Sequence, residues 1–340
     1  MTPGMKSQPI LVTGATGLVG GAVVHRLLDE GASVKILARN PAKTAGLSAR
    51  GALIQQGDMT DPTSLEEAVH GCSKVIHCAG VLGDEFKPLS YFRAVNVEGT
   101  RRLAEFALEH GVERFVHVST VAVYGFDARA DTTEDSPVHA SGDFYSDTKL
   151  QGQRVILNLV RERVLPGVVV QPAQVYGPGD ETWTLGPLRL IRAGKMILPG
   201  GGKGIVQPIF IEDLARGILA ALERGRPGET YILCGPQAVT IREFFSRLAA
   251  MIGHAPMKSA PAWVALAVAA LAEAGSKITG RPPRFTRSAV RFTLQETTFN
   301  GTKAEEELGF RAQTTLDRGM NAVSSWLERQ EWGLRGDGSA

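Results

Sequence analysis

The chain has 340 residues, of which 43% are hydrophobic and 21% charged, and its formal net charge at pH 7 is +2. This length and apolar content are sufficient for one large domain, or for one domain with an added lobe. No long block of like charges occurs, so the composition gives no sign of a nucleic-acid partner or of a strongly acidic one. We expect an ordinary solvated surface around a substantial core.

Cysteine content and the longest apolar stretch indicate the cellular compartment of the protein. Cys72, Cys78 and Cys234 are odd in number and form no CxxC pair, which suggests neither a disulfide framework nor a metal site. Residues 1–8 lack the pattern of a signal peptide, and the stretch 261–274 is shorter than the roughly 20 residues that span a bilayer. We therefore predict a cytoplasmic protein without a transmembrane span, and leave peripheral membrane association open.

The first half of the chain alternates short apolar runs with helical patterns. Strands are predicted at 10–13, 33–38, 52–54, 74–78, 114–119 and 168–170. Helices are predicted at 18–30, 62–69, 91–110 and 144–163. This alternation is typical of βαβ units and a parallel sheet. We predict an α/β fold, with a Rossmann doubly wound parallel sheet over residues 8–172.

The second half is less regular and is rich in glycine and proline. Helices are predicted at 187–193, 213–223, 241–252 and 315–329. We interpret residues 173–330 as a smaller C-terminal substrate-binding lobe, with segments around 205–235 that return to the Rossmann core. The tail at 333–340 is predicted to be disordered.

A glycine-rich segment, TGATGLVG, lies at 13–20 between the first predicted strand and helix. Gly14, Gly17 and Gly20 allow a tight turn, a close approach to a pyrophosphate, and close packing of helix on strand. The helix N-terminus then faces the phosphates. We predict a dinucleotide site here. Three further residues of the segment are predicted to contact the cofactor: Thr16, Leu18 and Val19.

The end of the second strand bears on which dinucleotide binds. An acidic residue there would hold the ribose 2′-hydroxyl of NAD, but the chain has Arg39, whose charge and fork of donors match a 2′-phosphate. We predict NADP as the cofactor and keep NAD as the alternative, because Arg39 is also compatible with an ordinary surface arginine. Asp58 follows the third strand, where it is placed to meet the adenine amine, and Met59 lies beside it.

Tyr145 and Lys149 form a YxxxK motif at the start of a predicted helix, and this spacing puts both side chains on one face. A phenol is a poor acid or base at neutral pH, and a neighbouring ammonium lowers its pKa. Ser119 and Thr120 end the fifth strand, where a hydroxyl can help to hold a substrate oxygen. The alternative for either hydroxyl is a strand-end cap.

Together these segments resemble the extended short-chain dehydrogenases/reductases. This class contains the NAD-dependent epimerases and dehydratases and the 3β-hydroxysteroid dehydrogenase-like reductases. The resemblance covers roughly residues 10–326. It is carried by TGATGLVG from Thr13, GDMTD from Gly57, HCAG from His77, NVEGT from Asn96, STVAVYG from Ser119, YSDTK from Tyr145, PAQVYGPG from Pro172, IFIEDLA from Ile209 and FNGTKAEEELGF from Phe299.

The resemblance implies roles for individual residues. Tyr145 would be the general acid/base, Lys149 would lower its pKa and hold the nicotinamide ribose, and Thr120 would bind the substrate oxygen, with Ser119 the neighbouring candidate. Five further residues are expected to border the cofactor: Ala79, Gly80, Asn96, Pro172 and Val175. It also implies a homodimer through the helices at 91–110 and 144–163.

The motifs also narrow the reaction. Sugar-nucleotide dehydratases of this class carry Asp-Glu after the threonine, whereas this chain has Val121 and Ala122. Epimerases often place an arginine seven residues before the aspartate matching Asp213, whereas this chain has Val206. We predict an NADP(H)-dependent oxidoreductase that interconverts a secondary alcohol and a ketone on a lipophilic, sterol-like or keto-acyl substrate. An NAD-dependent sugar-nucleotide epimerase or reductase is the alternative, and a non-catalytic dinucleotide-binding subunit is a third.

The apolar stretch 261–274 has three interpretations. A helix there fits a lid over a lipophilic substrate, a surface that contacts a membrane, or a helix packed in the protein itself. The segment 281–291 that follows is basic.

Overall fold

A seven-stranded parallel sheet forms the centre of the computed structural model, which describes residues 8–82, 87–126, 130–253, 257–279, 286–330 and 332. The strand order is β11-β6-β5-β4-β1-β2-β3, and each neighbouring pair is parallel. The strands are β1 (Ile10–Thr13), β2 (Val34–Ala38), β3 (Leu53–Gln56), β4 (Lys74–His77), β5 (Arg114–Val118), β6 (Gly167–Pro172) and β11 (Thr230–Leu233). The predicted doubly wound fold is confirmed.

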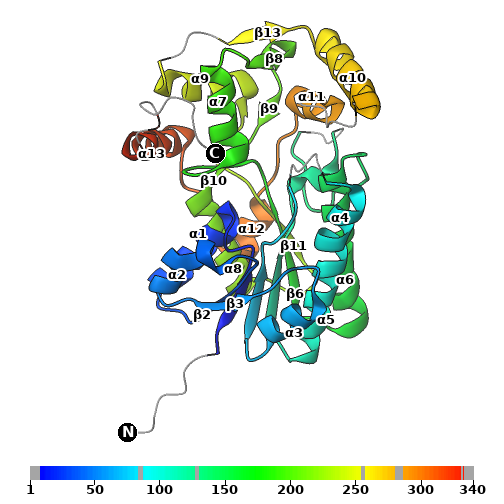
Figure 1. Cartoon of the computed structure of the whole chain (residues 1–340), viewed down its shortest axis with the longest axis vertical. Coiled ribbons are helices and arrows are strands. Elements are labelled where there is room, and N and C mark those ends of the chain that lie inside the picture. Colours follow the sequence, from blue (N-terminus) through cyan, green and yellow to red (C-terminus); the bar gives the residue numbers. More distant parts are fainter. Residues whose placement is uncertain are drawn as a thin grey trace.

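Helices cover both faces of this sheet (Figure 1). One face carries α1 (Leu18–Asp29), α8 (Ile211–Arg224) and α12 (Thr302–Leu308), and the other carries α3 (Pro62–Val69), α5 (Thr100–Glu109) and α6 (Phe144–Arg163). Within β1, Leu11 packs on the second face and Val12 on the first, because successive side chains of a strand point to opposite sides. Burial on both faces explains why the strands are continuous apolar runs in the sequence.

The helix predicted at 91–110 is interrupted in the structure. It consists of α4 (Leu89–Arg93), a π-helical turn at Ala94–Gly99, and α5. A Cβ on Gly99 would lie 2.5 Å from the carbonyl oxygen of Met59, so glycine allows this turn to approach the loop after β3. A π turn has no signature in hydrophobic spacing, which is why the sequence suggests one continuous helix.

The remaining elements lie beyond the carboxyl ends of the central strands (Figure 1). The helices are α7 (Gly186–Arg192), α9 (Ile241–Met251), α10 (Ala262–Thr279), α11 (Arg287–Leu294) and α13 (Leu316–Arg329). Three two-stranded pairs join them: β7 (Val175–Tyr176) with β10 (Ile209–Phe210), β8 (Ile197–Pro199) with β13 (Lys258–Ala260), and β9 (Ile205–Val206) with β12 (Val239–Thr240). An aromatic group centred on Trp183, Phe244 and Phe245 packs between these elements. A short helix outside this region, α2 (Ala45–Ala49), follows β2.

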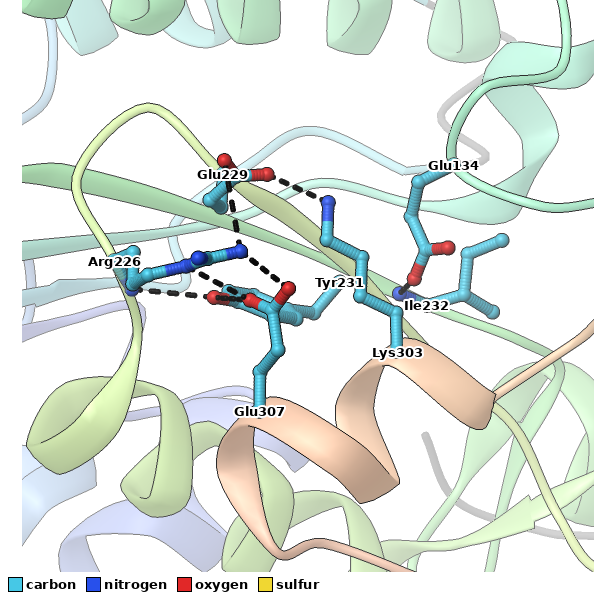
Figure 2. A network of polar contacts seen from close by, with 7 residues as sticks. All are labelled: Glu134, Arg226, Glu229, Tyr231, Ile232, Lys303 and Glu307. Carbon is cyan, nitrogen blue, oxygen red and sulfur yellow. Dashed lines mark hydrogen bonds and ion pairs between the residues drawn. The ribbon is translucent and has the colours of Figure 1, made fainter.

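Strand β11 is at one edge of the sheet, and polar side chains hold α12 and the loop containing Glu134 against it (Figure 2). The Ile232 amide donates to Oε1 of Glu134 at 2.7 Å, and the Tyr231 hydroxyl donates to Oε2 of Glu307 at 2.7 Å. Lys303, one turn before Glu307 on α12, donates to Glu229 at 2.6 Å. Unpaired groups of an edge strand are a liability, and here α12 and the loop containing Glu134 shield them.

The stretch 261–274 lies mostly in α10 and is two-sided. Ala265 and Ala269 are buried against Val290 of α11, whereas Trp263 is 73% exposed and Leu271 is 74% exposed. Across the described ranges, none of the helices is both long enough and apolar enough to cross a bilayer. Of the basic segment 281–291, the part before 286 lies outside the described residues, as does the tail 333–340.

Candidate active site

The glycine segment forms a turn that only glycine fits at two of its positions. Gly14 has a φ of +74°, and a Cβ there would lie 2.7 Å from the amide nitrogen of Ala79. A Cβ on Gly20 would lie 2.3 Å from the carbonyl oxygen of Gly14, so this glycine sets how closely α1 approaches β1. The turn therefore brings the start of α1 against the end of β4, as a dinucleotide cradle requires.

The start of α1 is open to an anionic ligand. Gly17 is its N-cap and offers no side chain to the first-turn amides, and the first turn contains no acidic residue. Such a terminus binds phosphate oxygens through free N–H groups and the helix dipole. Thr16 is exposed in the turn. Leu18 and Val19 are half-buried and pack against the apolar cluster that contains Phe244. The residues present thus fit the pyrophosphate of NAD(P).

A buried hydrogen-bonded chain connects the cradle with the helix that carries Asn96. The Ala79 amide donates to the Thr13 hydroxyl at 3.2 Å, and that hydroxyl lies 2.7 Å from Nδ1 of His77. On the other side of the ring, Nε2 lies 2.8 Å from the hydroxyl of Thr100, which itself donates to the Asn96 carbonyl at 2.9 Å. Because the Thr100 proton is already donated to the Asn96 carbonyl, Nε2 must donate to the Thr100 hydroxyl, and Nδ1 of the neutral ring accepts from the Thr13 hydroxyl.

His77 remains neutral in this chain. Burial, followed by the charge of Lys149, lowers the pKa of His77 to about 3. The sequence contains Thr13 and His77 within the TGATGLVG and HCAG motifs, yet neither was assigned a function. Only their pairing across β1 and β4 shows that they hold the cofactor cradle and the catalytic side of the sheet in register.

Asn96 is fixed by its side chain as well. Its Oδ1 accepts from the Val81 amide at 2.8 Å, and its Nδ2 donates to the Val81 carbonyl at 3.2 Å and to the Thr148 hydroxyl at 3.0 Å. Asn96 thereby ties the segment after β4 to α6. A Cβ on Gly80 would lie 3.3 Å from Oδ1 of Asn96 and 3.7 Å from Nζ of Lys149, so glycine keeps space in front of the lysine.

Tyr145, Lys149 and Thr120 come together at the carboxyl end of β5. Asp143 caps α6 by accepting from the Ser146 amide at 2.9 Å, which starts the helix immediately before Tyr145. Nζ of Lys149 donates to the Val118 carbonyl at 2.6 Å. Thr120 lies close enough to Tyr145 for its hydroxyl to lower the pKa of the phenol.

Burial sets the protonation states of the pair. Burial raises the pKa of Tyr145 to about 12, while the Thr120 hydroxyl acts in the opposite direction. Lys149 is not among the groups that lower this pKa. In the protein alone the outcome therefore differs from the sequence prediction of a lysine-lowered phenol. Burial also lowers the pKa of Lys149 to about 8. At neutral pH Tyr145 carries its proton and can donate it.

The two candidate hydroxyls at the end of β5 have different surroundings. Ser119 is buried and donates to Oε1 of Gln153 at 2.8 Å, and the same oxygen accepts from Gln171 at 3.0 Å. This places Ser119 in an internal polar network that continues to Tyr124. Thr120 instead contacts Tyr145 and also accepts from the Ala122 amide at 3.2 Å, so it acts as a cap as well.

Arg39 and Asp58 lie near each other beyond the ends of β2 and β3. Nε of Arg39 is 3.8 Å from Oδ2 of Asp58, its Nη1 donates to the Tyr91 hydroxyl at 3.3 Å, and its side chain is 72% exposed. The other oxygen of Asp58 accepts from the amide and hydroxyl of Thr60 at 2.8 and 2.6 Å. Arg39 is thus held beyond the end of β2 with donors still open to solvent.

The remaining residues predicted to contact the cofactor lie at or beyond the carboxyl ends of the strands. Met59 is buried under the turn at Gly99, and Pro172 is buried at the end of β6, where it pairs with Leu233. Val175 follows in β7 and is half-buried. Cys78 lies close enough to Lys149 to influence its pKa, and burial raises the pKa of this thiol to about 12.

A cavity of about 490 Å³ is lined by segments that adjoin Thr120 and Tyr145 in the chain. Its walls come from three segments: Gly125 and Phe126 after the turn that begins at Thr120, residues 139–141 before α6, and the end of α11 with Gln295. Sequence reasoning missed His139 and Arg291 among the lining residues, because only the folded chain brings these segments together.

Comparisons with known proteins agree with this geometry. The model of the NAD dependent epimerase/dehydratase family matches residues 10–234. A 4-hydroxy-2-methyl-3-oxo-4-farnesyl-3,4-dihydroquinoline-1-oxide ketoreductase of Stigmatella aurantiaca is 29% identical over 92% of this chain and 94% of its own. A 2-alkyl-3-oxoalkanoate reductase of Shewanella oneidensis is 28% identical over 95% and 87%.

The fold also matches solved structures. A double mutant of DesIV, a dTDP-glucose 4,6-dehydratase from Streptomyces venezuelae with NAD bound, is 26% identical with a TM-score of 0.78, over 95% of this chain and 98% of that one. The resemblance predicted from the motifs is confirmed. The chain belongs to the NAD dependent epimerase/dehydratase family of extended short-chain dehydrogenases/reductases and is an NAD(P)-dependent enzyme acting on CH–OH groups.

Proposed function

We propose that this protein is an NADP(H)-dependent ketoreductase that interconverts a ketone and a secondary alcohol on a lipophilic, sterol-like or keto-acyl substrate. The observation that carries the proposal is the protonated Tyr145 with the Thr120 hydroxyl close to it and Lys149 on the same helix face. A neutral phenol next to a second hydroxyl is suited to bind a carbonyl oxygen and then protonate it.

Each residue has one task in this reaction. When bound, the reduced nicotinamide supplies a hydride to the carbonyl carbon. Tyr145 donates its proton to the carbonyl oxygen, and Thr120 hydrogen-bonds the same oxygen and so holds it in place. Lys149, fixed to the Val118 carbonyl, would hold the nicotinamide ribose, and with the cofactor bound its charge would favour the phenolate that remains on Tyr145. In the direction of oxidation the same phenolate accepts the proton of the alcohol.

A lipophilic substrate is supported by the lining of the cavity and by the relatives. Phe126 and Leu294 supply apolar surface to the cavity, and α10 has an apolar face above α11. The Stigmatella and Shewanella relatives are named for a farnesyl-bearing oxo compound and for an oxoalkanoate. Both names describe ketones attached to apolar chains, which matches the proposed substrate class.

Replacing Tyr145 by phenylalanine tests the proposed chemistry. Tyr145→Phe removes the proton donor and keeps the ring, so we expect turnover of ketones to fall by at least about 10²-fold while NADPH still binds. Steady-state kinetics gives the first quantity and quenching or enhancement of nicotinamide fluorescence gives the second. Turnover equal to that of the wild type would show that Tyr145 is not the acid.

Preference for NADP over NAD is proposed from Arg39. An exposed guanidinium at the end of β2 is suited to a 2′-phosphate, although Asp58 at 3.8 Å offsets part of its charge. We expect NADPH to bind more tightly than NADH, and Arg39→Asp to remove this preference. Lys43→Asp makes the same charge change on a nearby exposed side chain and should leave it intact. Equal affinity of the wild-type protein for both cofactors would contradict the proposal.

Sugar-nucleotide epimerisation or reduction with NAD is the alternative, and the likeness to the NAD-bound dehydratase favours it. Two positions count against it. Val206, where epimerases often carry an arginine, is fully buried in β9, and Val121 and Ala122 stand where dehydratases carry an acid pair. Tightly held NAD⁺ in the purified protein would favour this alternative. The third possibility, a non-catalytic subunit, would be supported if the wild-type protein bound the cofactor but turned over no ketone or sugar nucleotide.

A further inference from the structure

Arg291 lines the cavity of about 490 Å³. The segments opposite it are close to the reacting groups in the chain: Gly125 follows Thr120 by five residues, and Ser141 precedes Tyr145 by four. A substrate whose carbonyl oxygen is held by Tyr145 and Thr120 would therefore extend toward the cavity that Arg291 lines.

The charge of Arg291 is not compensated within the described chain. Arg287, one turn earlier on α11, is paired with Glu273 of α10, with Nε and Oε2 2.7 Å apart. Arg291 makes no ion pair or hydrogen bond with any described residue. Among the described residues that line the cavity, none is acidic. One arginine of this helix is thus used in packing α10, and the other is left facing the cavity.

The surroundings of Arg291 fit an anion attached to an apolar chain. Phe126 and Leu294 provide apolar lining, and Gln295 and His139 provide polar groups in the same lining as Arg291. A guanidinium presents a planar fork of donors that matches a carboxylate in a bidentate arrangement. A lipophilic ketone that also carries a carboxylate would use both kinds of surface.

We propose that Arg291 binds the carboxylate of the substrate, so that the protein selects acidic keto-acyl substrates over neutral ketones. This assignment rests on the proposed ketoreductase function and narrows its substrate class. Arg291 anchors the acid group at the cavity wall, Phe126 and Leu294 contact the chain, and the carbonyl lies at Tyr145 and Thr120. A neutral ester of the same skeleton would occupy the cavity but would leave the guanidinium without its partner.

Binding measurements test the assignment without requiring turnover. A medium-chain 3-oxo acid and its methyl ester are titrated separately into the protein, and calorimetry measures their affinities. The protein is saturated with oxidised cofactor, because this form of the cofactor cannot reduce either ligand. We expect the wild-type protein to bind the acid about tenfold more tightly than the ester, because a charge-assisted bidentate pair is lost in the ester. Arg291→Gln should abolish the difference, and Arg291→Lys should retain part of it.

Arg287→Gln is the matched control, since it removes the same charge from the same helix but from a residue engaged with Glu273. It should keep the tenfold preference for the acid. Equal affinity of the wild-type protein for acid and ester, or an undiminished preference in Arg291→Gln, would overturn the assignment. Selective binding of the acid, together with no reduction of it when NADPH replaces the oxidised cofactor, would instead contradict the ketoreductase function and leave the role of Arg291 in place.

Discussion

Burial changes the pKa of the two central side chains in opposite directions. It raises the pKa of Tyr145 to about 12 and lowers the pKa of Lys149 to about 8, because a low-dielectric site penalises the charged form of each. The phenol is consequently a proton donor in the free protein. The ammonium of Lys149 is retained at neutral pH at a cost to stability, with the Val118 carbonyl as its hydrogen-bond acceptor.

This cost makes the stability depend on pH in a defined direction. Between about pH 8 and pH 10.4 the unfolded chain keeps the lysine proton that the folded protein has lost, so the free energy of unfolding rises with pH over this window. Lys149→Met lacks this dependence. We expect the stability of the wild-type protein relative to Lys149→Met to increase by up to about 3 kcal/mol from pH 7 to pH 10.

Urea unfolding of both proteins across this pH range measures the difference. Lys43→Met is the control, because Lys43 is exposed and its removal should shift the curve equally at every pH. If the difference in the free energy of unfolding between wild type and Lys149→Met stays constant from pH 7 to pH 10, the folded protein does not lower the pKa of Lys149.

At the scale of elements, edge strand β11 depends on side chains from distant segments (Figure 2). Glu134, in the loop before α6, accepts from the buried Ile232 amide, and burial raises the pKa of this carboxyl. Arg226 contacts both Glu307 and Glu229, and Lys303 contacts Glu229, so α12 is held against the start of β11. The FNGTKAEEELGF motif thus has a structural function at the sheet edge.

Glu134 provides a clear test of this arrangement. Glu134→Ala leaves the Ile232 amide buried without an acceptor, and we expect it to lower the free energy of unfolding by about 1–3 kcal/mol. Glu134→Gln keeps an acceptor oxygen and removes the buried charge, so it should be close to the wild type. Equilibrium denaturation distinguishes the two variants. Equal destabilisation by both would mean that the charge of Glu134, rather than its acceptor, is what matters.

The sequence anticipated the elements unequally. Helix α6 has the bounds that the sequence predicts, and strands β1 to β6 agree with their predicted bounds to within a few residues, because apolar runs and helical spacing are local signals. The π-helical turn at Ala94–Gly99 and the short pairs such as β9 with β12 were not predicted, since contacts with distant segments define them. Strand β11 is not predicted either, because it lies in an irregular stretch of the sequence.

For the whole molecule, the cofactor cradle and the substrate cavity are built differently. The cradle comes from consecutive βα units at the N-terminal end of the chain, whereas the cavity joins two distant regions, residues 125–141 and the end of α11 with Gln295. Homodimerisation, a cytoplasmic location and contact of α10 with a membrane surface stay predictions. The exposed Trp263 and Leu271 keep the last of these open, because one face of α10 already packs on α11.

The sequence by itself determined the fold class, the glycine cradle and the Tyr145–Lys149 motif. Each depends on local constraints: the period of apolar residues, the backbone freedom of glycine at Gly14, and the i, i+4 spacing on one helix face. Only the tertiary structure decided which strand-end hydroxyl contacts Tyr145, which way the two pKa values move, and that Arg291 faces the cavity. Burial and contacts between residues far apart in the chain fix these properties, and no local pattern encodes them.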